Sequence, residues 1–128
     1  MTHPTDCPCG SGRPFAQCCG PYLAGTTPPP DAEALMRSRY CAYVLRDEAW
    51  LLATWHPDTR PASLGLDREP ATKWLGLAVK RHENGGEGRA VVEFVARYKI
   101  HGRAHRLHEN SRFLLENGRW WYLDGNCP

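Results

Sequence analysis

The sequence predicts an α+β fold in which a small N-terminal metal-binding module precedes a body of helices and then an antiparallel sheet. Four of the six cysteines fall within residues 7–19, a density typical of a metal site. Apolar residues recur with helical spacing within residues 31–56. From residue 73 onward, alternating apolar segments are separated by turn signals, which indicates strands.

The bulk composition is that of an ordinary globular domain. The chain has 128 residues, of which 41% are hydrophobic and 23% charged, so it can bury one core of useful size. Its net charge of +2 is too small to indicate nucleic-acid binding by itself. No apolar run approaches the ~20 residues of a membrane helix, and the first residues lack the pattern of a secretory signal. We therefore expect a cytoplasmic protein with reduced thiols and no membrane partner.

The segment CPCGSGRPFAQCC predicts a zinc site. Zinc favours thiolates in a closed tetrahedron, and four cysteines complete one with no open position, which is typical of a structural site. We expect a short helix across PFAQCC to carry the second pair of ligands, and Phe15 to cover the sulfur atoms. Zinc binding would supply most of the folding free energy of so small a unit, on the order of 10 kcal/mol in comparable peptides. The expected ligands are Cys7, Cys9, Cys18 and Cys19.

Two other interpretations of these thiols compete with zinc. Disulfides would need a strained bridge between Cys7 and Cys9, a bridge between the adjacent Cys18 and Cys19, or cross-pairing, all in a reducing compartment. A redox dithiol would normally show Cys-x-x-Cys spacing, which is absent here. The spacing therefore favours zinc over both.

Two helices are predicted after a proline-rich connector. Three consecutive prolines, Pro28–Pro30, indicate a stiff, extended segment. Asp31 and Asp47 are each suited to the N-cap position of a helix, and Pro57 should end the second helix. One face of the first helix gathers the apolar residues Leu35, Met36, Tyr40, Tyr43 and Val44.

The C-terminal half predicts a four-stranded antiparallel meander. The segments ENGGEG, HG and NG lie between the apolar segments and act as turn signals, and Asn-Gly is strongly associated with type I′ hairpins. Residues 58–72 are mixed in character and predict no element. The expected strands span residues 73–82, 89–100, 103–116 and 119–125.

The cysteine segment resembles the SEC-C motif, a zinc-binding motif first noted at the C-terminus of the bacterial preprotein translocase ATPase. Pro14 and Phe15 stand where the motif usually has a basic residue and a tyrosine, and neither is a ligand. The order of helices and sheet resembles the nuclear transport factor 2-like fold, a cone that often encloses a pocket. The stretches LMRSRYCAYV, TWHP, WLGL, FVARY, ENSRF and ENGRWWYLDG extend the resemblance over nearly the whole chain, to the YchJ family of uncharacterised bacterial proteins.

This resemblance implies a SEC-C zinc module at residues 1–22, a connector at 23–30 and a cone-shaped nuclear transport factor 2-like domain at 31–128. Because the motif serves protein contact in the translocase, the resemblance implies a zinc-binding adaptor. Its partner would be a protein that is ribosome-associated or related to secretion. Cone-shaped domains of this kind often form homodimers. The basic turn at residues 99–108 supports a nucleic-acid contact only weakly.

The alternative function is a small-molecule binding protein or an enzyme that uses the pocket of the cone. We expect Arg37 or Arg39 to form an internal ion pair with Glu109, and His56 to cap the end of its helix. No residue is assigned a catalytic role, and a binding protein is favoured over an enzyme. The candidate pocket residues are Arg37, Arg39, His56, Trp74, Glu109, Ser111 and Arg112.

Overall fold

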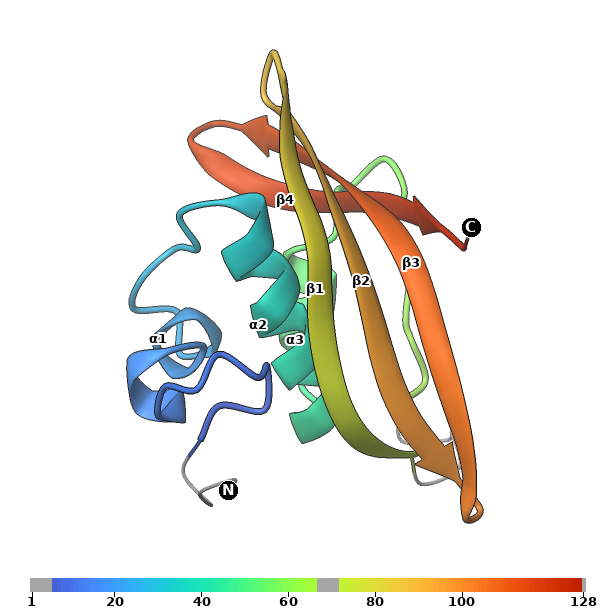
Figure 1. Ribbon diagram of the computed structural model, residues 1–128. Helices are drawn as coiled ribbons and strands as arrows, with labels where there is room; N and C mark the ends of the chain where they lie inside the picture. Colours follow the sequence, from blue (N-terminus) through green and yellow to red (C-terminus); the bar gives the residue numbers. More distant parts are fainter. Residues whose placement is uncertain (1–5, 67–71, 128) are drawn as a thin grey trace.

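The computed structural model describes residues 6–66 and 72–127 (Figure 1). Residues 1–5 and 128, which the sequence assigns to the ends of the module and the body, lie outside the described residues. The predicted fold class is confirmed, with short helices first and a four-stranded antiparallel sheet after them. The elements are η1 (Phe15–Gln17), α1 (Gly20–Leu23), α2 (Ala32–Leu45), α3 (Glu48–Ala53), β1 (Thr72–Gly86), β2 (Arg89–Ile100), β3 (Arg103–Glu116) and β4 (Arg119–Asn126).

Both predicted helix caps are present. The Asp31 carboxylate accepts a hydrogen bond from the backbone N–H of Ala34 at 2.7 Å, and the Asp47 carboxylate accepts one from the N–H of Trp50 at 3.0 Å. Each satisfies one of the amide groups that a helix start leaves unpaired. The two aspartates therefore fix where α2 and α3 begin.

The second helix ends earlier than expected. It stops at Ala53, before the predicted end at Pro57, because the chain turns to pair with β4. The backbone N–H of Tyr122 donates to the Thr54 carbonyl at 2.9 Å, and the N–H of His56 donates to the Tyr122 carbonyl at 2.7 Å. Tertiary pairing, and not proline, ends this helix.

The sheet order is β1-β2-β3-β4, so each strand pairs with its neighbours in sequence. Both residues between each pair of strands have positive φ, as type I′ turns require. β1 runs to Gly86, past the predicted end at residue 82, because the turn lies at the last two residues of ENGGEG. The three turns are Glu87–Gly88, His101–Gly102 and Asn117–Gly118.

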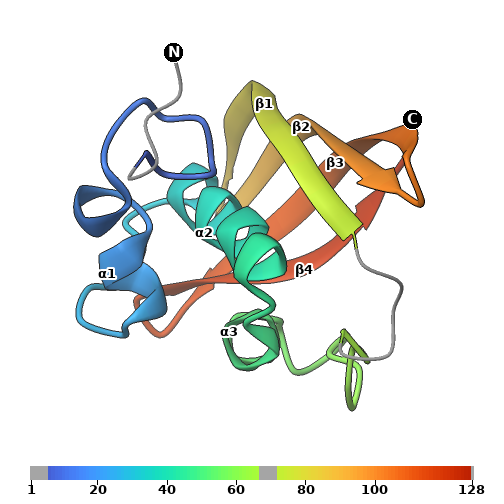
Figure 2. The same ribbon diagram turned by 90° about the horizontal axis from the view of Figure 1, so that it is seen from below.

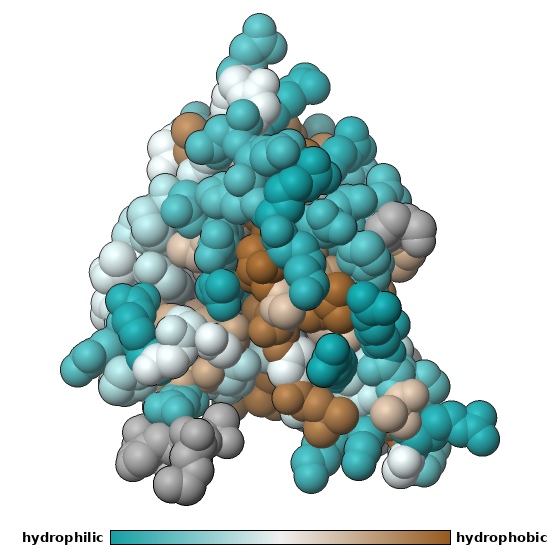
Figure 3. Space-filling model, in the orientation of Figure 1, coloured by the Kyte–Doolittle hydropathy of each residue, from teal (hydrophilic) through white to brown (hydrophobic). Residues whose placement is uncertain are grey.

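The curved sheet wraps around α2, with α3 near the β4 side and the cysteine-containing segment on the far side of α2 from the sheet centre (Figures 1 and 2). Buried residues of α2 pack against inward-facing residues of β2 and β3 and form the main core, which includes Leu35, Val92 and Phe113. Hydrophilic residues cover most of the face in Figure 3 and surround a central group of hydrophobic ones. Within the described residues, no helix has the length and apolar character needed to cross a membrane.

Candidate functional site

Four buried thiols lie together at the N-terminal end of the chain. The sulfur atoms of Cys7, Cys9, Cys18 and Cys19 all lie within 4.8 Å of one another. The Sγ–Sγ distance is 3.6 Å between Cys9 and Cys18 and 4.0 Å between Cys18 and Cys19. A tetrahedral zinc site with Zn–S bonds of about 2.3 Å has sulfur–sulfur edges of about 3.8 Å. The thiol cluster, as we call these four residues, therefore has the spacing of four ligands around one metal ion.

The backbone that carries the thiol cluster differs from the predicted helix across PFAQCC. The chain makes a single 3₁₀ turn at Phe15–Gln17, departs from helical angles at Cys18 (φ −125°, ψ −103°), and begins α1 only at Gly20. Consecutive residues of one helix point about 100° apart, so a continuous helix would separate two adjacent sulfur atoms. The break at Cys18 lets both adjacent cysteines face the same centre.

The first ligand pair lies in a tight loop. The backbone N–H of Cys7 donates to the Arg13 carbonyl at 2.9 Å, which closes the loop at its base. Gly10 and Gly12 have φ values of 81° and 82°, the left-handed region that glycine enters without strain. Phe15 packs against the thiol cluster, so its predicted role as apolar cover is confirmed.

The surroundings of the thiol cluster favour the ionised form of Cys7 and Cys9, whereas burial raises the pKa of Cys18 and hydrogen bonds, first that with Cys41, raise the pKa of Cys19. Hydrogen bonds with Cys19 and, with a smaller effect, Cys41 hold the pKa of Cys9 well below its ordinary value. The same two neighbours lower the pKa of Cys7 to about 6. The exposed Arg13 guanidinium has its pKa raised by a hydrogen bond with the Cys18 sulfur. Deprotonated thiols are the form that binds a metal cation.

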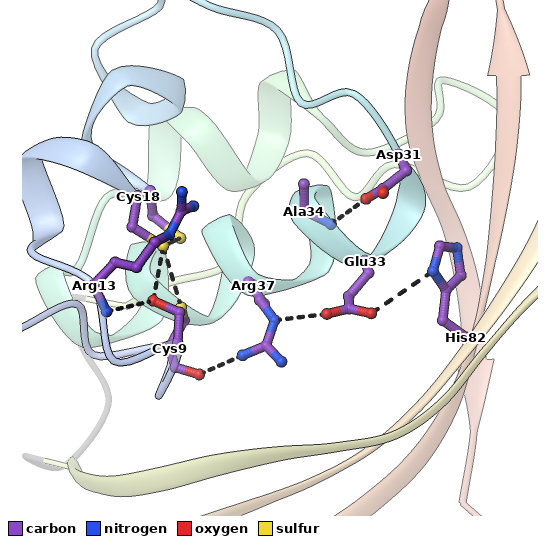
Figure 4. Close-up of polar contacts among 10 residues, drawn as sticks. Cys9, Arg13, Cys18, Asp31, Glu33, Ala34, Arg37 and His82 are labelled. Carbon is purple, nitrogen blue, oxygen red and sulfur yellow. Dashed lines mark hydrogen bonds and ion pairs between the residues drawn. The ribbon is translucent and has the colours of Figure 1, made fainter.

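A fifth buried cysteine, Cys41 of α2, lies beside the thiol cluster and was missed by the sequence analysis. It is 0% exposed, and its Sγ lies 3.5 Å from that of Cys7. Arg37, four positions earlier on the same helix face, donates from Nη1 to the Cys9 carbonyl at 2.8 Å and from Nε to Glu33 at 3.0 Å (Figure 4). The module is therefore docked on α2 as well as connected to it through the chain.

A cavity of about 340 Å³ lies between α2 and the inner face of the sheet. Four of the seven candidate pocket residues line it: Arg39, Trp74, Glu109 and Ser111. The wall is largely aromatic, and it includes Tyr40, Tyr43, Phe94, Tyr98, Phe113 and Tyr122.

The other three candidates lie elsewhere. Arg37 contacts the module, and Arg112 forms an ion pair with Asp124, with Nε and Oδ1 at 2.6 Å. His56 does not cap the carbonyls at the end of α3, contrary to expectation. Its Nε2 lies 2.9 Å from a carboxylate oxygen of Glu116, and its Nδ1 accepts a hydrogen bond from the backbone N–H of Asp58. The turn after α3 carries His56 away from the helix axis and towards β4, which explains the difference.

The expected ion pair between an α2 arginine and Glu109 is wrong for the described residues. The Arg39 Nη1 donates to the Leu51 carbonyl at 2.8 Å and to Thr54 Oγ1 at 2.7 Å. Burial lowers the pKa of Arg39 to about 10. Glu109 accepts a hydrogen bond from the Ser111 hydroxyl, and no ion pair among the described residues includes it. The Leu51 carbonyl of α3 and the hydroxyl of Thr54, which directly follows α3, therefore hold the Arg39 guanidinium in place.

Known protein families match both the N-terminal module and the body of the chain. The YchJ middle NTF2-like domain matches residues 31–125, and the SEC-C motif matches residues 6–21. A UPF0225 protein of Ralstonia nicotianae is 55% identical, with 94% of this chain and 90% of that protein covered. A UPF0225 protein of Chromobacterium violaceum is 58% identical over 93% of this chain and 90% of its own length.

Two solved structures share the fold. The solution structure of a SEC-C motif containing protein from Rhodopseudomonas palustris is 37% identical, with a TM-score of 0.85 and coverage of 96% of this chain and 98% of that one. The crystal structure of a SEC-C motif containing protein from Psychrobacter arcticus is 28% identical, with a TM-score of 0.81 and coverage of 98% and 84%. The likeness therefore extends over the module and the body together.

Proposed function

Because this chain belongs to the YchJ family of SEC-C motif proteins, we propose that it is a zinc-binding protein whose metal-ordered module presents a surface to a protein partner. One observation supports this above the others: four buried thiols with tetrahedral spacing at the SEC-C motif. We place the protein in the cytoplasm, where a reducing environment keeps these thiols available to a metal.

Zinc suits the donor set better than other common metals do. Four thiolates are soft ligands, which magnesium, calcium and manganese avoid. A tetrahedron of four sulfur atoms is typical of zinc or of iron–sulfur sites, and zinc needs no electron-transfer partner. The four residues of the thiol cluster would hold the ion, which would cross-link the loop to the segment before α1. With no open position, such a site stabilises structure and leaves catalysis to other residues.

The module offers an outward surface that the metal would fix in place. The thiols point inward, whereas the backbone between them carries the exposed residues Ser11, Arg13, Ala16 and Gln17. A loop held rigid before binding loses less entropy when a partner docks. We propose a partner that is ribosome-associated or related to secretion, by analogy with the role of the motif in the translocase.

The test compares the wild-type chain with a Cys18→Ser, Cys19→Ser double variant. Native mass spectrometry of protein purified without chelator should give one zinc per wild-type chain and none for the double variant. Capture of partners from a bacterial lysate and co-sedimentation with ribosomes should both fall in the double variant. Cys127→Ser changes an exposed thiol outside the thiol cluster and serves as the matched control. If the wild-type chain and the double variant captured the same partners equally well, the proposed adaptor function would be wrong.

The cavity supports a second candidate function, the binding of a small molecule. Its volume of about 340 Å³ and its aromatic wall with a few polar groups fit the usual form of ligand sites. Glu109→Gln should change ligand affinity without unfolding the chain. Unfolding with no change in affinity would instead mean that Glu109 serves only the fold.

A further inference from the structure

We propose that the cavity selects a flat, uncharged aromatic molecule that carries a hydrogen-bond donor and an acceptor side by side, as a carboxamide does. This inference rests on the second candidate function, that the cavity is a ligand site. It follows from the placement of two opposite charges and a set of aromatic rings on the cavity wall.

The two charged residues of the wall face the same space without contacting each other. Arg39 comes from α2 and Glu109 from β3, and both line the cavity. They form no ion pair with each other within the described residues. Glu109 is nevertheless near enough for its charge to oppose the fall in the pKa of Arg39 that burial causes. On this proposal, a ligand group in the cavity lies between them and contacts both.

Each charged group is held in position by its own neighbours. The two hydrogen bonds that Arg39 makes to described residues both leave from Nη1, whereas a guanidinium carries five N–H donors. The guanidinium carbon lies 4.3 Å from the centre of the Tyr122 ring and 5.1 Å from that of the Trp55 ring. Glu109 packs against Gly125 of β4, where any Cβ would collide with the carboxylate. These contacts fix where a ligand acceptor and a ligand donor would be placed.

The cavity wall also provides aromatic surfaces for a flat ring. Trp74 lies at the centre of an aromatic group, with ring centres 5.6 Å from Tyr40, 5.8 Å from Tyr43 and 5.3 Å from Tyr98. Offset and edge-on contacts of this kind favour a planar aromatic guest over a bulky aliphatic one. The polar pair would then bind the substituent while these rings bind the ring system.

The balance of charge argues against an ionic ligand. A carboxylate ligand would be attracted to the Arg39 guanidinium but repelled by the Glu109 carboxylate. An amidinium ligand would be attracted to Glu109 but repelled by Arg39. Arg39 is buried and Glu109 half-buried, so each like-charge approach is only partly screened and lowers affinity, and the site disfavours both. A carboxamide offers its oxygen to Arg39 and its NH₂ to Glu109 with no charge conflict.

Three isosteric probes test this inference: benzamide, benzoate and benzamidine. Binding is followed by titration of the full zinc-loaded chain, with the indole N–H signal of Trp74 as the reporter in two-dimensional NMR. Benzamide is expected to bind about ten-fold or more tightly than either charged probe, a difference of about 1.4 kcal/mol. In Glu109→Gln, Arg39 has no opposing charge, so benzoate should gain more than this difference in affinity and overtake benzamide. Glu87→Gln, on the exposed β1–β2 turn, is the matched control and should leave the order unchanged.

The outcomes test separately whether the cavity binds ligands at all and whether it prefers the proposed class of ligand. A charged probe that binds as tightly as benzamide, or an unchanged order in Glu109→Gln, would overturn the proposed class and leave the cavity as a ligand site. If no probe shifts the Trp74 signal at millimolar concentration, both the class and the second candidate function fail. Because the wild-type ranking needs no substitution, the test stands even if Glu109→Gln does not fold.

Discussion

The two parts of this chain are held together by different chemistry. In residues 6–23 the buried atoms are mainly the sulfurs of the thiol cluster, with few apolar neighbours. In the body, aliphatic and aromatic side chains such as Leu35, Val92 and Phe113 form a continuous core between α2 and the sheet. On the proposed zinc site, a metal ion would replace the core that the module lacks, whereas the body can rely on hydrophobic burial.

One helix serves both parts. α2 presents Arg37 and Cys41 to the module, and it presents Arg39 and Tyr40 to the cavity. The two parts therefore share a structural wall, although they depend on different forces. Perturbing each force separately tests whether the two parts fold independently.

Metal removal should have the largest and most confined effect. A strong chelator added to the wild-type chain should disorder residues 7–23, because the free energy of metal binding, on the order of 10 kcal/mol in comparable sites, holds this segment together. Amide signals of β2 and β3 should keep their positions and their protection from hydrogen exchange. Collapse of the sheet signals at the same chelator concentration would show that the two parts are not separable.

A cavity-creating change in the core should do the opposite. Phe113→Ala is expected to lower the free energy of unfolding by about 3–5 kcal/mol, because the ring is 1% exposed and its loss leaves a void. Urea unfolding monitored by tryptophan fluorescence gives the value. The folded fraction should still carry one metal ion per chain, and a substoichiometric metal content in that fraction would contradict the prediction.

Cys41→Ala probes the boundary between the two parts. We expect a loss of about 1 kcal/mol in stability, from a buried side chain made smaller, and no change in metal stoichiometry, because four ligands remain. Cys127→Ala, at an exposed position, is the matched control and should leave both quantities unchanged. Loss of the metal in Cys41→Ala alone would instead make Cys41 a ligand.

Removal of a helix cap should have an effect no larger than that of Cys41→Ala. Asp31→Ala removes the acceptor for the Ala34 N–H and should cost about 1 kcal/mol, visible as a lower midpoint in thermal unfolding. Asp31→Asn keeps an oxygen in the same position and should lie close to wild type. Equal destabilisation by both variants would mean that the charge, and not the cap, matters at this position.

Features determined by neighbouring residues were predictable from the sequence. Asn117–Gly118 gave a two-residue turn because both residues tolerate positive φ, and the aspartate caps appeared where expected. The spacing of the thiol cluster likewise follows from a short segment. In each case the residues that decide the structure lie within a few positions of one another.

Features determined by distant segments were not predictable in the same way. Nothing near Cys41 in the sequence indicates that it lies beside Cys7, because the two meet only when α2 packs against the module. The early end of α3 and the partners of Arg39 depend on β4 and on the α2–α3 packing. Charge alone favours a pair between Arg39 and Glu109, whereas the folded chain offers Arg39 the Leu51 carbonyl of α3 and the hydroxyl of Thr54, which follows it.

The loops that border the sheet also bear on self-association. An open strand edge is a template for pairing with another chain. Here the backbone at Thr54 and His56 hydrogen-bonds to Tyr122 of β4, and Gly10 of the metal-binding loop lies against the Leu77 carbonyl of β1, where an added Cβ would approach to 3.2 Å. Loss of the metal would release the contact of Gly10 with β1 but leave the hydrogen bonds of Thr54 and His56 with β4 in place. The backbone of β1 near Leu77 would therefore be more open to pairing in the metal-free but otherwise folded protein.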